Sequence, residues 1–426
     1  TASLKPLPPH CWGPSPALWY DHVPTNTSAQ RAVARSSTNA PMIAGIPAET
    51  FPGERRVSIT PGVIPTLTKA GLEVLLEAGA GQSAGFTDTA YLNKGARVAT
   101  NRADVFGEAD IILQVRTPGA NPTSGQPELD LFRPDHTVIG FSDPLSEPSL
   151  ARDLGSRGVT CFSMELIPRI TRAQSMDALS SMATIAGYKA VIVAAERLPR
   201  MFPMMMTAAG TVTPARVFVV GAGVAGLQAI ASARRLGAKV EAYDVRPAVK
   251  EQVESLGATF VDLPLDTDGS EDAGGYAKTQ DQAFYARQQA MMSRVVASSD
   301  VVITTALIPG RQAPVLITDE MIAGMAAGAV VVDLAAERGG NVEPSLPNQV
   351  VIAHDVTVMG PTNLPASVPH HASQMYAKNV STFLLHLLDD GKVRLNLDDE
   401  ITQSTLVCHG GQVVHPRVRE LLAPHD

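Results

Sequence analysis

Short apolar runs alternate with amphipathic stretches along most of the chain. The apolar runs are bounded by polar or glycine-containing segments, which is typical of buried strands, and the stretches between them repeat their apolar positions at helical spacing. The strands expected on this basis span residues 42–46, 72–77, 110–115, 137–141, 158–163, 216–220, 239–243, 259–263, 301–306 and 329–334. The expected helices span residues 61–70, 177–198, 227–236, 250–256, 282–297, 319–326 and 379–388. Strands that alternate with helices in this way predict an α/β protein.

The stretch RVFVVGAGVAG runs from a buried strand through a Gly-x-Gly-x-x-Gly turn into a helix. Gly221 allows the tight turn, Gly223 lets the backbone approach a pyrophosphate, and Gly226 brings the helix close to the strand. The first residues of the helix, Val224 and Ala225, offer free backbone N–H groups and the positive end of the helix dipole to phosphates. The stretch therefore predicts a dinucleotide-binding site, and the alternative is a merely structural turn.

An acidic residue follows at the tip of the next expected strand. Asp244 stands about 20 residues after the glycine turn, where a carboxylate binds both ribose hydroxyls and repels a 2′-phosphate. Asp244, with Val245 beside it, therefore favours NAD(H) over NADP(H). Arg246 is close enough to help a 2′-phosphate, and we interpret it as secondary while the acid is present.

The strands after the glycine turn continue a doubly wound pattern. Ligands bind beyond the carboxyl ends of such strands, which places Thr305, Ala306 and Leu307, together with residues 333–340, beside the dinucleotide. The whole pattern predicts two Rossmann-like, doubly wound parallel-sheet domains separated by a cleft, with a short β-rich tail that returns to the first domain. Residues 79–85 (GAGQSAG) are similar to a second phosphate loop, but no acid follows at the right distance, so an ordinary turn is favoured.

A polar loop precedes the expected helix at residues 177–198. Asp177 is a plausible N-cap of that helix, and capping alone is the structural alternative for Asp177 and Ser180. Arg169 and Gln174 have no evident structural role other than surface salt bridges. A polar cluster just before a helix that bridges two domains is a candidate surface of the cleft.

A second long polar loop spans residues 266–280. Loops of this length in a compact α/β domain tend to be lids or disordered segments. Tyr276, which follows two glycines, suits a lid with an aromatic tip. An idle surface loop is an equally good interpretation of the sequence.

Composition narrows the class of protein. With 426 residues, of which 45% are hydrophobic, the chain supports two or three domains. It has no uninterrupted apolar stretch of about 18 residues, so we do not expect it to cross a membrane by itself. The net charge of −8 carries no basic stripe, which argues against nucleic acid as a partner. The three cysteines form no metal-ligand spacing, so we expect no metal site and a reducing compartment.

Longer motifs add a resemblance to known families. Residues 54–61 (ERRVSITP), the glycine turn and residues 306–310 (ALIPG) resemble segments that alanine dehydrogenase shares with the NAD(H)-binding component of proton-translocating NAD(P) transhydrogenase. The loop at residues 169–181, the helix segment at 185–191 (IAGYKAV) and the segment at 274–278 (GGYAK) resemble the transhydrogenase component alone. The resemblance runs from about residue 42 to the end of the chain.

The residues that alanine dehydrogenase uses for its own chemistry are replaced. That family keeps a histidine acid/base where this chain has Asp143, a lysine where it has Arg116, and an aspartate where it has Glu337. Reductive amination needs a proton-transfer group of near-neutral pKa, whereas hydride transfer between two nicotinamides needs none. Residues 363–369 (NLPASVP) look more like alanine dehydrogenase, so that activity stays open as an alternative, together with a non-catalytic NAD-binding protein.

The resemblance implies a role for each candidate side chain. NADH bound here would transfer its hydride directly to NADP⁺ on a partner component, and a membrane component would couple the reaction to proton translocation. Arg169, Asp177 and Ser180 would hydrogen-bond the nicotinamide carboxamide, Gln174 would reach toward the incoming NADP(H), and Tyr276 would close the lid.

The composition and the resemblance together predict how the chain is organised. Residues 1–40, which are rich in proline and then in small polar residues, are an extension or linker. Residues 41–168 with 366–426 would form the first α/β domain, and residues 169–365 the NAD(H)-binding domain. A homodimer is expected, with this component soluble and membrane-associated only through its partner components, in a mitochondrial, bacterial or other inner membrane.

Overall fold

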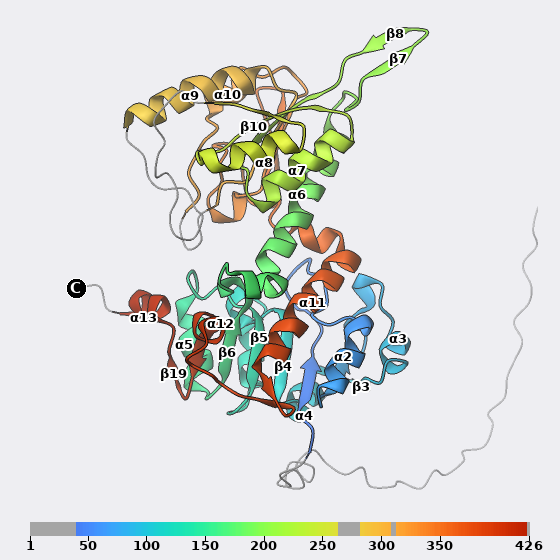
Figure 1. Ribbon diagram of the computed structural model, residues 1–426, viewed down its shortest axis with the longest axis vertical. Coiled ribbons are helices and arrows are strands. Elements are labelled where there is room, and N and C mark those ends of the chain that lie inside the picture. The colour runs from blue at the N-terminus through green and yellow to red at the C-terminus, as the bar shows by residue number, and fades with distance from the viewer. Residues whose placement is uncertain (1–39, 263–281, 308–311, 424–426) are drawn as a thin grey trace, which may run out of the picture. The chain divides into compact units, whose positions relative to one another are not determined.

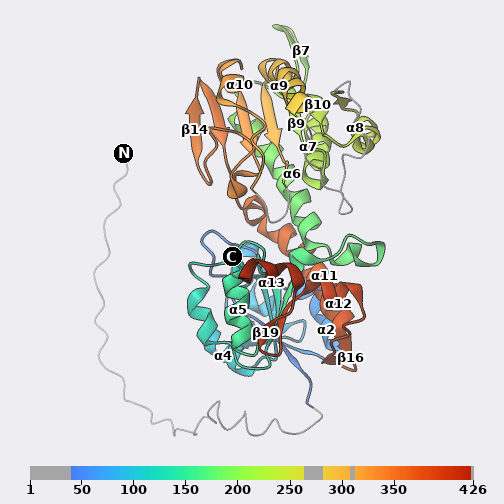
Figure 2. The same cartoon turned by 90° about the vertical axis from the view of Figure 1, so that its left-hand side faces the viewer.

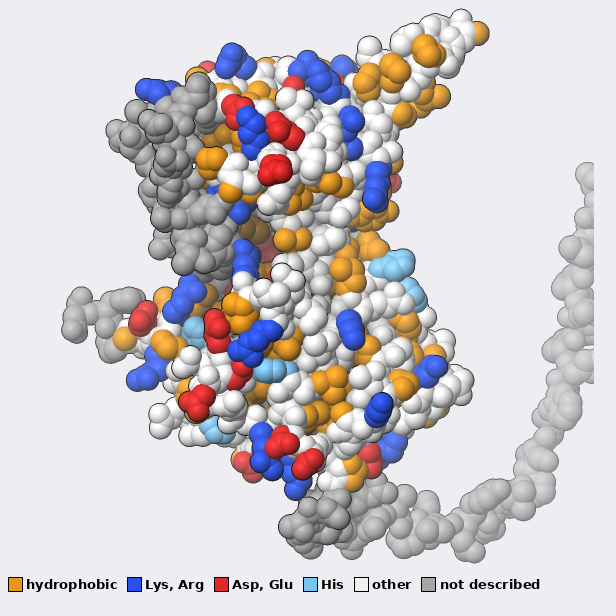
Figure 3. All heavy atoms as spheres, viewed as in Figure 1, with side chains coloured by type: hydrophobic (Ala, Val, Ile, Leu, Met, Phe, Trp, Pro, Cys, Tyr) orange, Lys and Arg blue, Asp and Glu red, His pale blue; other side chains and the backbone are white. Residues whose placement is uncertain are grey.

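The computed structural model describes residues 40–262, 282–307 and 312–423. Two mainly parallel sheets, each flanked by helices, organise the portion of the chain that follows residue 40 (Figure 1; Figure 2). The prediction of two Rossmann-like, doubly wound domains is confirmed. On the face shown in Figure 3, the molecule is narrower between the two domains.

The first sheet has the strand order β19-β18-β6-β5-β4-β1-β2-β3 among the described residues. Strands β1 to β6 are parallel, whereas β18 pairs antiparallel with β6 and β19 pairs antiparallel with β18. The expected return of the tail to the first domain is therefore correct. The strands are β1 (Ile43–Ile46), β2 (Glu73–Glu77), β3 (Arg97–Ala99), β4 (Ile111–Arg116), β5 (Thr137–Phe141), β6 (Thr160–Ser163), β18 (Leu406–His409) and β19 (Gln412–Val413). The helices of this domain are α2 (Ile64–Lys69), α3 (Asp88–Leu92), α4 (Arg102–Glu108), α5 (Pro148–Ser156), α11 (Pro369–Leu387), α12 (Glu400–Thr405) and α13 (Pro416–Leu422).

The second sheet has the order β11-β10-β9-β12-β13-β15-β14, with only its edge strand β14 antiparallel among the described strands. From β9 the chain moves to β10 and β11 on one side, and later returns to β12 and β13 on the other. The direction of winding therefore reverses between β9 and β12. The strands are β9 (Arg216–Val220), β10 (Lys239–Tyr243), β11 (Thr259–Phe260), β12 (Val301–Thr304), β13 (Val330–Asp333), β14 (Val350–Ala353) and β15 (Val356–Met359). Its helices are α7 (Val224–Arg235), α8 (Lys250–Ser255), α9 (Gln282–Ala297) and α10 (Asp319–Ala323).

Strand β9 shows why the expected strands are continuous apolar runs. Val217 and Val219 belong to the core on one face of the second sheet, and Phe218 and Val220 to the core on the other face. A strand that is covered by helices on both faces needs apolar residues at every position. The absence of alternation in the sequence is thus a consequence of the doubly wound architecture.

Helix α6 (Ala178–Arg197) takes part in both domains. Its first half places Met182 and Ile185 in the core of the first domain, and its second half places Ala190 and Ala194 in the core of the second. By length and composition it is also the helix of the described residues that is apolar enough to cross a membrane. Because its two halves are buried in different cores, α6 is a helix that joins two folded domains.

Several expectations about the last third of the chain need correction. Helix α11 begins at Pro369, ten residues earlier than expected, and Tyr376 lies inside it rather than before it. Proline at the first turn fixes a helical φ without losing a hydrogen bond, so the helix starts there despite its polar first residues. The tail that we expected to be β-rich also contains α12 and α13. Short elements such as β3, α3 and the β14–β15 pair were missed because each spans too few residues to show a period.

A small hairpin extends from the second domain, between α6 and β9. It consists of β7 (Met205–Thr207) and β8 (Gly210–Val212), which pair antiparallel. The side chains of Met204 and Met206 are 58% and 78% exposed. Figure 3 shows hydrophobic side chains gathered along this hairpin. It was not predicted, since a three-residue strand is too short to show a hydrophobic pattern.

Candidate functional site

The glycine turn between β9 and α7 has the geometry that each glycine predicts. Gly221 has a φ of +95°, which a residue with a side chain rarely adopts. A Cβ at Gly226 would lie 1.8 Å from the carbonyl oxygen of Gly221, so no side chain fits between helix and strand. A Cβ at Gly223 would meet no atom within 4 Å. The space beside Gly223 is therefore open to a ligand that approaches the backbone, as a pyrophosphate does.

The position of the turn in the sheet supports the same ligand. Strand β9 lies at the point where the winding direction reverses, and ligands of open α/β sheets bind outside the carboxyl ends of the strands at that point. The N–H groups of Val224 and Ala225 begin α7 here, so the positive end of its dipole faces the same place. A bound pyrophosphate thus fits the turn in shape and in charge.

Asp244 is more engaged than the sequence suggested. Its Oδ2 accepts a hydrogen bond from the Ala222 N–H at 2.7 Å, which fixes the glycine turn to the end of β10. Arg246 donates to both carboxylate oxygens, from Nε at 2.9 Å and from Nη2 at 2.8 Å. The charge of Arg246 offsets part of the repulsion that the acid would exert on a 2′-phosphate. The interpretation of Arg246 as a secondary group while the acid is present stays a prediction. Val245 packs against the apolar core of the second domain, and its part in dinucleotide binding stays a prediction.

The end of β12 is held by a residue that the sequence did not reveal. Asn341 accepts a hydrogen bond from the Ala306 N–H and donates to the Ala306 carbonyl, both at 2.9 Å. Thr305 donates to the Gly221 carbonyl at 3.0 Å, and the side chain of Leu307 is 41% exposed. Thr305 therefore lies beside the glycine turn, and the contact of residues 305–307 with a dinucleotide stays a prediction. The only sequence signal for Asn341 is the pair of glycines directly before it, both of which have positive φ.

Helix α6 connects the glycine turn to the polar loop. A Cβ at Gly187 would lie 2.0 Å from the Ala225 carbonyl oxygen, so α6 packs its backbone directly against the start of α7. Ser180 precedes Gly187 by seven residues, which is about 10 Å along the helix axis. The start of α6 therefore lies within reach of a ligand that extends away from the phosphate turn.

The polar loop takes the form of a 3₁₀ helix, η6 (Thr171–Met176), that leads into α6. Asp177 caps α6, because its Oδ1 accepts the Ser180 N–H at 2.8 Å. The Ser180 hydroxyl donates to Asp177 Oδ2 at 2.6 Å, so the two side chains bind each other as well. The side chains of Arg169 and Gln174 are exposed. The loop thus combines one capping pair with two side chains that face solvent, while Tyr276 lies outside the described residues.

The loops after β4, β5 and β13 bring charged residues of the two domains together. Arg338 donates to Asp143 Oδ2 at 2.6 Å, across the two domains. Arg116 lies 3.5 Å from Glu54 Oε2 and 4.0 Å from Glu337 Oε1. The three residues that replace the catalytic residues of alanine dehydrogenase, Asp143, Arg116 and Glu337, thus all take part in ion pairs. The sequence did not indicate Arg338 as a partner of Asp143.

Two buried acids of the same region differ in their ionisation. Burial opposes the ionisation of Glu54, but hydrogen bonds and charge from Arg56 outweigh it and lower the pKa of Glu54 to about 2. Burial, and after it the charge of Glu54, raise the pKa of Glu49 to about 8, against hydrogen bonds from the Val115 and Arg116 N–H groups. A neutral and an ionised carboxyl group therefore lie close together in the first domain at neutral pH.

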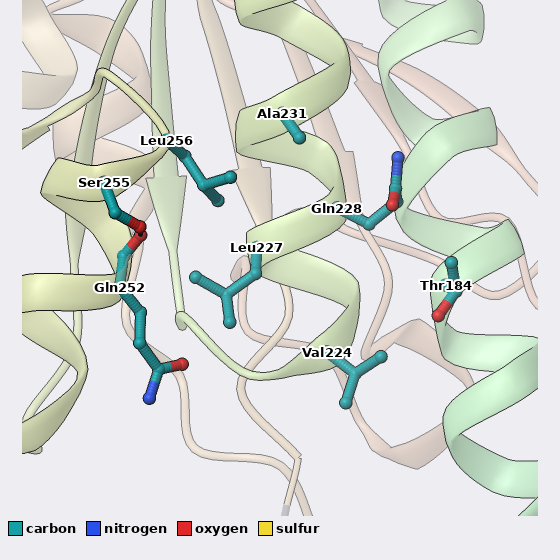
Figure 4. Close-up of a pocket in the computed structure, with 8 residues that line it drawn as sticks. All are labelled: Thr184, Val224, Leu227, Gln228, Ala231, Gln252, Ser255 and Leu256. Atoms are coloured by element: carbon teal, nitrogen blue, oxygen red, sulfur yellow. Dashed lines mark hydrogen bonds between the residues drawn. The ribbon is translucent and has the colours of Figure 1, made fainter. Parts of the chain in front are cut away.

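A depression of about 380 Å³ lies elsewhere on the second domain, between α6, α7 and α8 (Figure 4). Residues Val224, Leu227, Gln228 and Ala231 of α7 line it. At 100° per residue these four face away from the residues of α7 that pack on the sheet. The depression therefore lies on the outer side of α7, and at Val224 it borders the start of that helix beside the glycine turn. No cluster of metal-ligating side chains occurs within residues 40–262, 282–307 and 312–423.

Comparisons with known proteins agree with this geometry. The family description "Alanine dehydrogenase/PNT, N-terminal domain" matches residues 45–186, and "Alanine dehydrogenase/PNT, C-terminal domain" matches residues 190–416. An NAD(P) transhydrogenase alpha subunit protein of Rhodospirillum rubrum is 46% identical over 87% of this chain and 97% of its own length.

The solved structures that are similar to this chain include a transhydrogenase and an alanine dehydrogenase. The transhydrogenase structure from Sinorhizobium meliloti has a TM-score of 0.78 and 46% identity, and covers 87% of this chain and 100% of its own. An L-alanine dehydrogenase structure has a TM-score of 0.75 and 26% identity, over 89% of this chain and 99% of its own. The two neighbours share the fold almost equally, whereas the sequence identity is much higher to the transhydrogenase.

Proposed function

Because the chain belongs to the alanine dehydrogenase/PNT family, we propose that it is the NAD(H)-binding component of a proton-translocating NAD(P) transhydrogenase. In this role it holds NADH for direct hydride transfer to NADP⁺ on a partner component, and a membrane component couples the transfer to proton translocation. The relatives named as transhydrogenase alpha subunits support the assignment at the level of the family.

The ion pair between Asp143 and Arg338 is the observation that favours transhydrogenation over alanine dehydrogenation. An alanine dehydrogenase needs a group that exchanges a proton near neutral pH at this place. In this chain Asp143 stands there instead of a histidine, and its Oδ2 accepts a hydrogen bond from Arg338 Nη2 at 2.6 Å. Arg116 is also engaged, by Glu54 and Glu337, so the three positions that correspond to the catalytic residues of alanine dehydrogenase hold charge pairs. Hydride transfer between two nicotinamides requires no such group.

The described residues divide the work of holding the dinucleotide. The turn at Gly221, Gly223 and Gly226 receives the pyrophosphate, and Asp244 shares its hydrogen-bonding capacity between Arg246 and the ribose. The nicotinamide supplies the hydride chemistry itself.

Orientation of the reacting ring falls to the polar loop. Arg169 and the pair formed by Asp177 and Ser180 hold the carboxamide, and Gln174 faces the partner's nucleotide. Tyr276 keeps its proposed role as the tip of a lid. Catalysis by this chain then consists of orienting the nicotinamide ring and excluding water from it, because no group of the protein forms a covalent bond with the substrate.

The test follows NADH in two steps. The chain is first titrated with NADH by fluorescence, and pyruvate and ammonium are added to the complex. The NADP(H)-binding component of a transhydrogenase is then added with thio-NADP⁺, whose reduced form absorbs at a longer wavelength than NADH. We expect saturable binding, no loss of NADH to pyruvate and ammonium, and reduction of thio-NADP⁺ only with the partner component. Oxidation of NADH by pyruvate and ammonium, or no transfer to thio-NADP⁺, would overturn the proposal.

The proposed assembly is a homodimer. The hairpin of β7 and β8 supports it, because an isolated two-stranded hairpin is at best marginally stable in water and this one exposes Met204, Met205 and Met206. Sedimentation velocity should give a dimer for the chain and a monomer for Met206→Glu. A monomeric unmodified chain would contradict this aspect of the proposal.

The proposed location follows from the partner components. A membrane component places the assembly at an inner membrane, mitochondrial, bacterial or other, with this chain in a reducing compartment. The free thiols of Cys161 and Cys408 agree with such a compartment. Co-fractionation of the chain with membranes only when the membrane component is present is the corresponding measurement.

A further inference from the structure

The polar loop before α6 is tied to a segment of the chain that lies about 200 residues away. Asn379 of α11 donates from Nδ2 to the Ser175 carbonyl oxygen at 2.9 Å. Arg172 Nη1 lies 2.6 Å from Asp399 Oδ1, and Asp399 also caps α12 by accepting the Thr402 N–H at 2.8 Å. Two helices of the first domain therefore hold a loop that leads into the second.

Asn379 is an unusual residue for its place in the fold. It is 6% exposed, on a helix whose neighbouring positions Val380 and Phe383 are fully buried in the core. Its Oδ1 is buried and has no hydrogen-bond partner within the described residues. A buried amide with one unpaired oxygen is costly, and an apolar residue of similar size would serve the fold better. Packing alone does not explain an asparagine here, whereas its bond to Ser175 does.

The loop benefits from an external tie because its own backbone hydrogen bonds are of the 3₁₀ type. It is a 3₁₀ turn with i→i+3 bonds, such as Asp177 N–H to the Gln174 carbonyl at 3.3 Å, and bonds of this kind have poor geometry. Ala173 and Met176 anchor it in the core of the first domain. Ser175 and Met176 stand between Gln174, which is proposed to face the partner's nucleotide, and Asp177, which is proposed to hold the carboxamide. A bond to the Ser175 carbonyl therefore fixes a peptide group between these two residues.

We propose that Asn379 is a positioning residue that sets, through the Ser175 carbonyl, where Gln174 faces the partner's nucleotide and where Asp177 faces the bound nicotinamide. The ion pair of Arg172 with Asp399 is a second, more exposed tie on the same loop. This inference rests on the proposed function, because it assumes that the loop orients a nicotinamide. It adds a residue of the first domain, remote in sequence, to the machinery of hydride transfer.

The experiment compares Asn379→Leu with a matched control on the same helix. Leucine keeps the size of the side chain, removes the donor to Ser175 and also removes the unpaired oxygen, so the fold should lose little stability. The control is Ser373→Ala, which removes another buried hydrogen bond from α11, that from the Val57 N–H to the Ser373 hydroxyl at 3.0 Å. Asn379→Asp is the second variant, since a carboxylate has the same shape and cannot donate to a carbonyl.

Two readouts separate positioning from packing. Hydrogen–deuterium exchange of peptides covering residues 168–178, without nucleotide, should be faster in Asn379→Leu than in the unmodified chain or in Ser373→Ala. Hydride transfer to thio-NADP⁺ with the partner component, at saturating nucleotide, should fall about tenfold to a hundredfold in both Asn379 variants, because misplacement by about 1 Å costs up to that much. NADH affinity should stay within about threefold, since the phosphate and ribose contacts are untouched.

The outcomes distinguish this inference from the function it rests on. No hydride transfer by the unmodified chain would refute the proposed function. Transfer by the unmodified chain with an equal rate in the Asn379 variants would refute the role of Asn379 alone. A parallel loss of NADH affinity and rate would show a general structural role and would overturn the inference. Equal exchange in the loop peptides of all variants would show that Asn379 does not hold the loop and would overturn it as well.

Discussion

Alanine substitutions at two glycines of the same turn should affect different properties: Gly226→Ala should lower stability, and Gly223→Ala should weaken NADH binding. In Gly226→Ala the new Cβ would lie 1.8 Å from the Gly221 carbonyl oxygen, whereas ordinary contact begins at 3.4 Å. Helix α7 and strand β9 must therefore separate by about 1.5 Å, and overpacking of this kind costs roughly 1–3 kcal/mol or more. The thermal midpoint should fall by roughly 2–12 °C, at about 2–4 °C per kcal/mol for a domain of this size.

In Gly223→Ala the same methyl group points into open space. The φ of −78° at Gly223 suits alanine, and no atom lies within 4 Å of the new Cβ. The free energy of unfolding should therefore change by no more than about 0.5 kcal/mol. The methyl group would instead occupy the place where a pyrophosphate meets the backbone. Loss of one charge-assisted hydrogen bond, about 1.5–3 kcal/mol, weakens NADH binding by roughly tenfold to 150-fold.

Thermal unfolding and NADH fluorescence titration together test this reasoning. Gly62→Ala is a matched control, because its Cβ also meets no atom within 4 Å but lies in the first domain; both measurements should stay unchanged. Gly223→Ala with unaltered NADH affinity would mean that no phosphate approaches this backbone. Gly223→Ala with a large loss of stability would show that the space beside it is required by the fold.

Three further substitutions address the loop, the ribose site and the buried acids. Gln174→Ala should slow hydride transfer to the partner's nucleotide more than it weakens NADH binding, since its contact forms mainly in the joined state; equal losses in rate and affinity would contradict this role. Asp244→Ala should weaken NADH binding about tenfold or more and, by removing the carboxylate beside Arg246, improve the relative affinity for NADPH in a competition titration; unchanged affinities would remove Asp244 from the site. Glu49, with a folded-state pKa of about 8 against an ordinary value of 4.5, keeps a proton that the unfolded chain releases. Its contribution to the free energy of unfolding therefore falls by about 1.4 kcal/mol per pH unit between those two values. In Glu49→Gln, denaturant titrations across this range should lack that portion of the decline, and identical pH slopes would show that Glu49 is ionised in the folded protein.

The amino-acid sequence by itself determined the local elements of this protein. The glycine turn, the buried strands around it, the cap formed by Asp177 and the acid at the end of β10 could all be predicted. Each of these depends on residues that are close in sequence, and each constrains the backbone or the burial of neighbouring positions in a periodic or fixed pattern. The order of elements then led to two doubly wound sheets, because few arrangements bury such runs on both faces.

Only the tertiary structure decided which remote side chains meet. Arg338 binds Asp143, Asn341 binds Ala306, and Asn379 binds Ser175. No period or spacing in the sequence records such pairs, because they depend on the packing of whole elements against one another. The pairing of Asp244 with Arg246 was also undecided, although the two are neighbours, since the direction of a long side chain is set by the charges and space around it. The candidate site thus consists of a local motif that can be recognised in the sequence and of contacts between remote residues that form only in the folded chain.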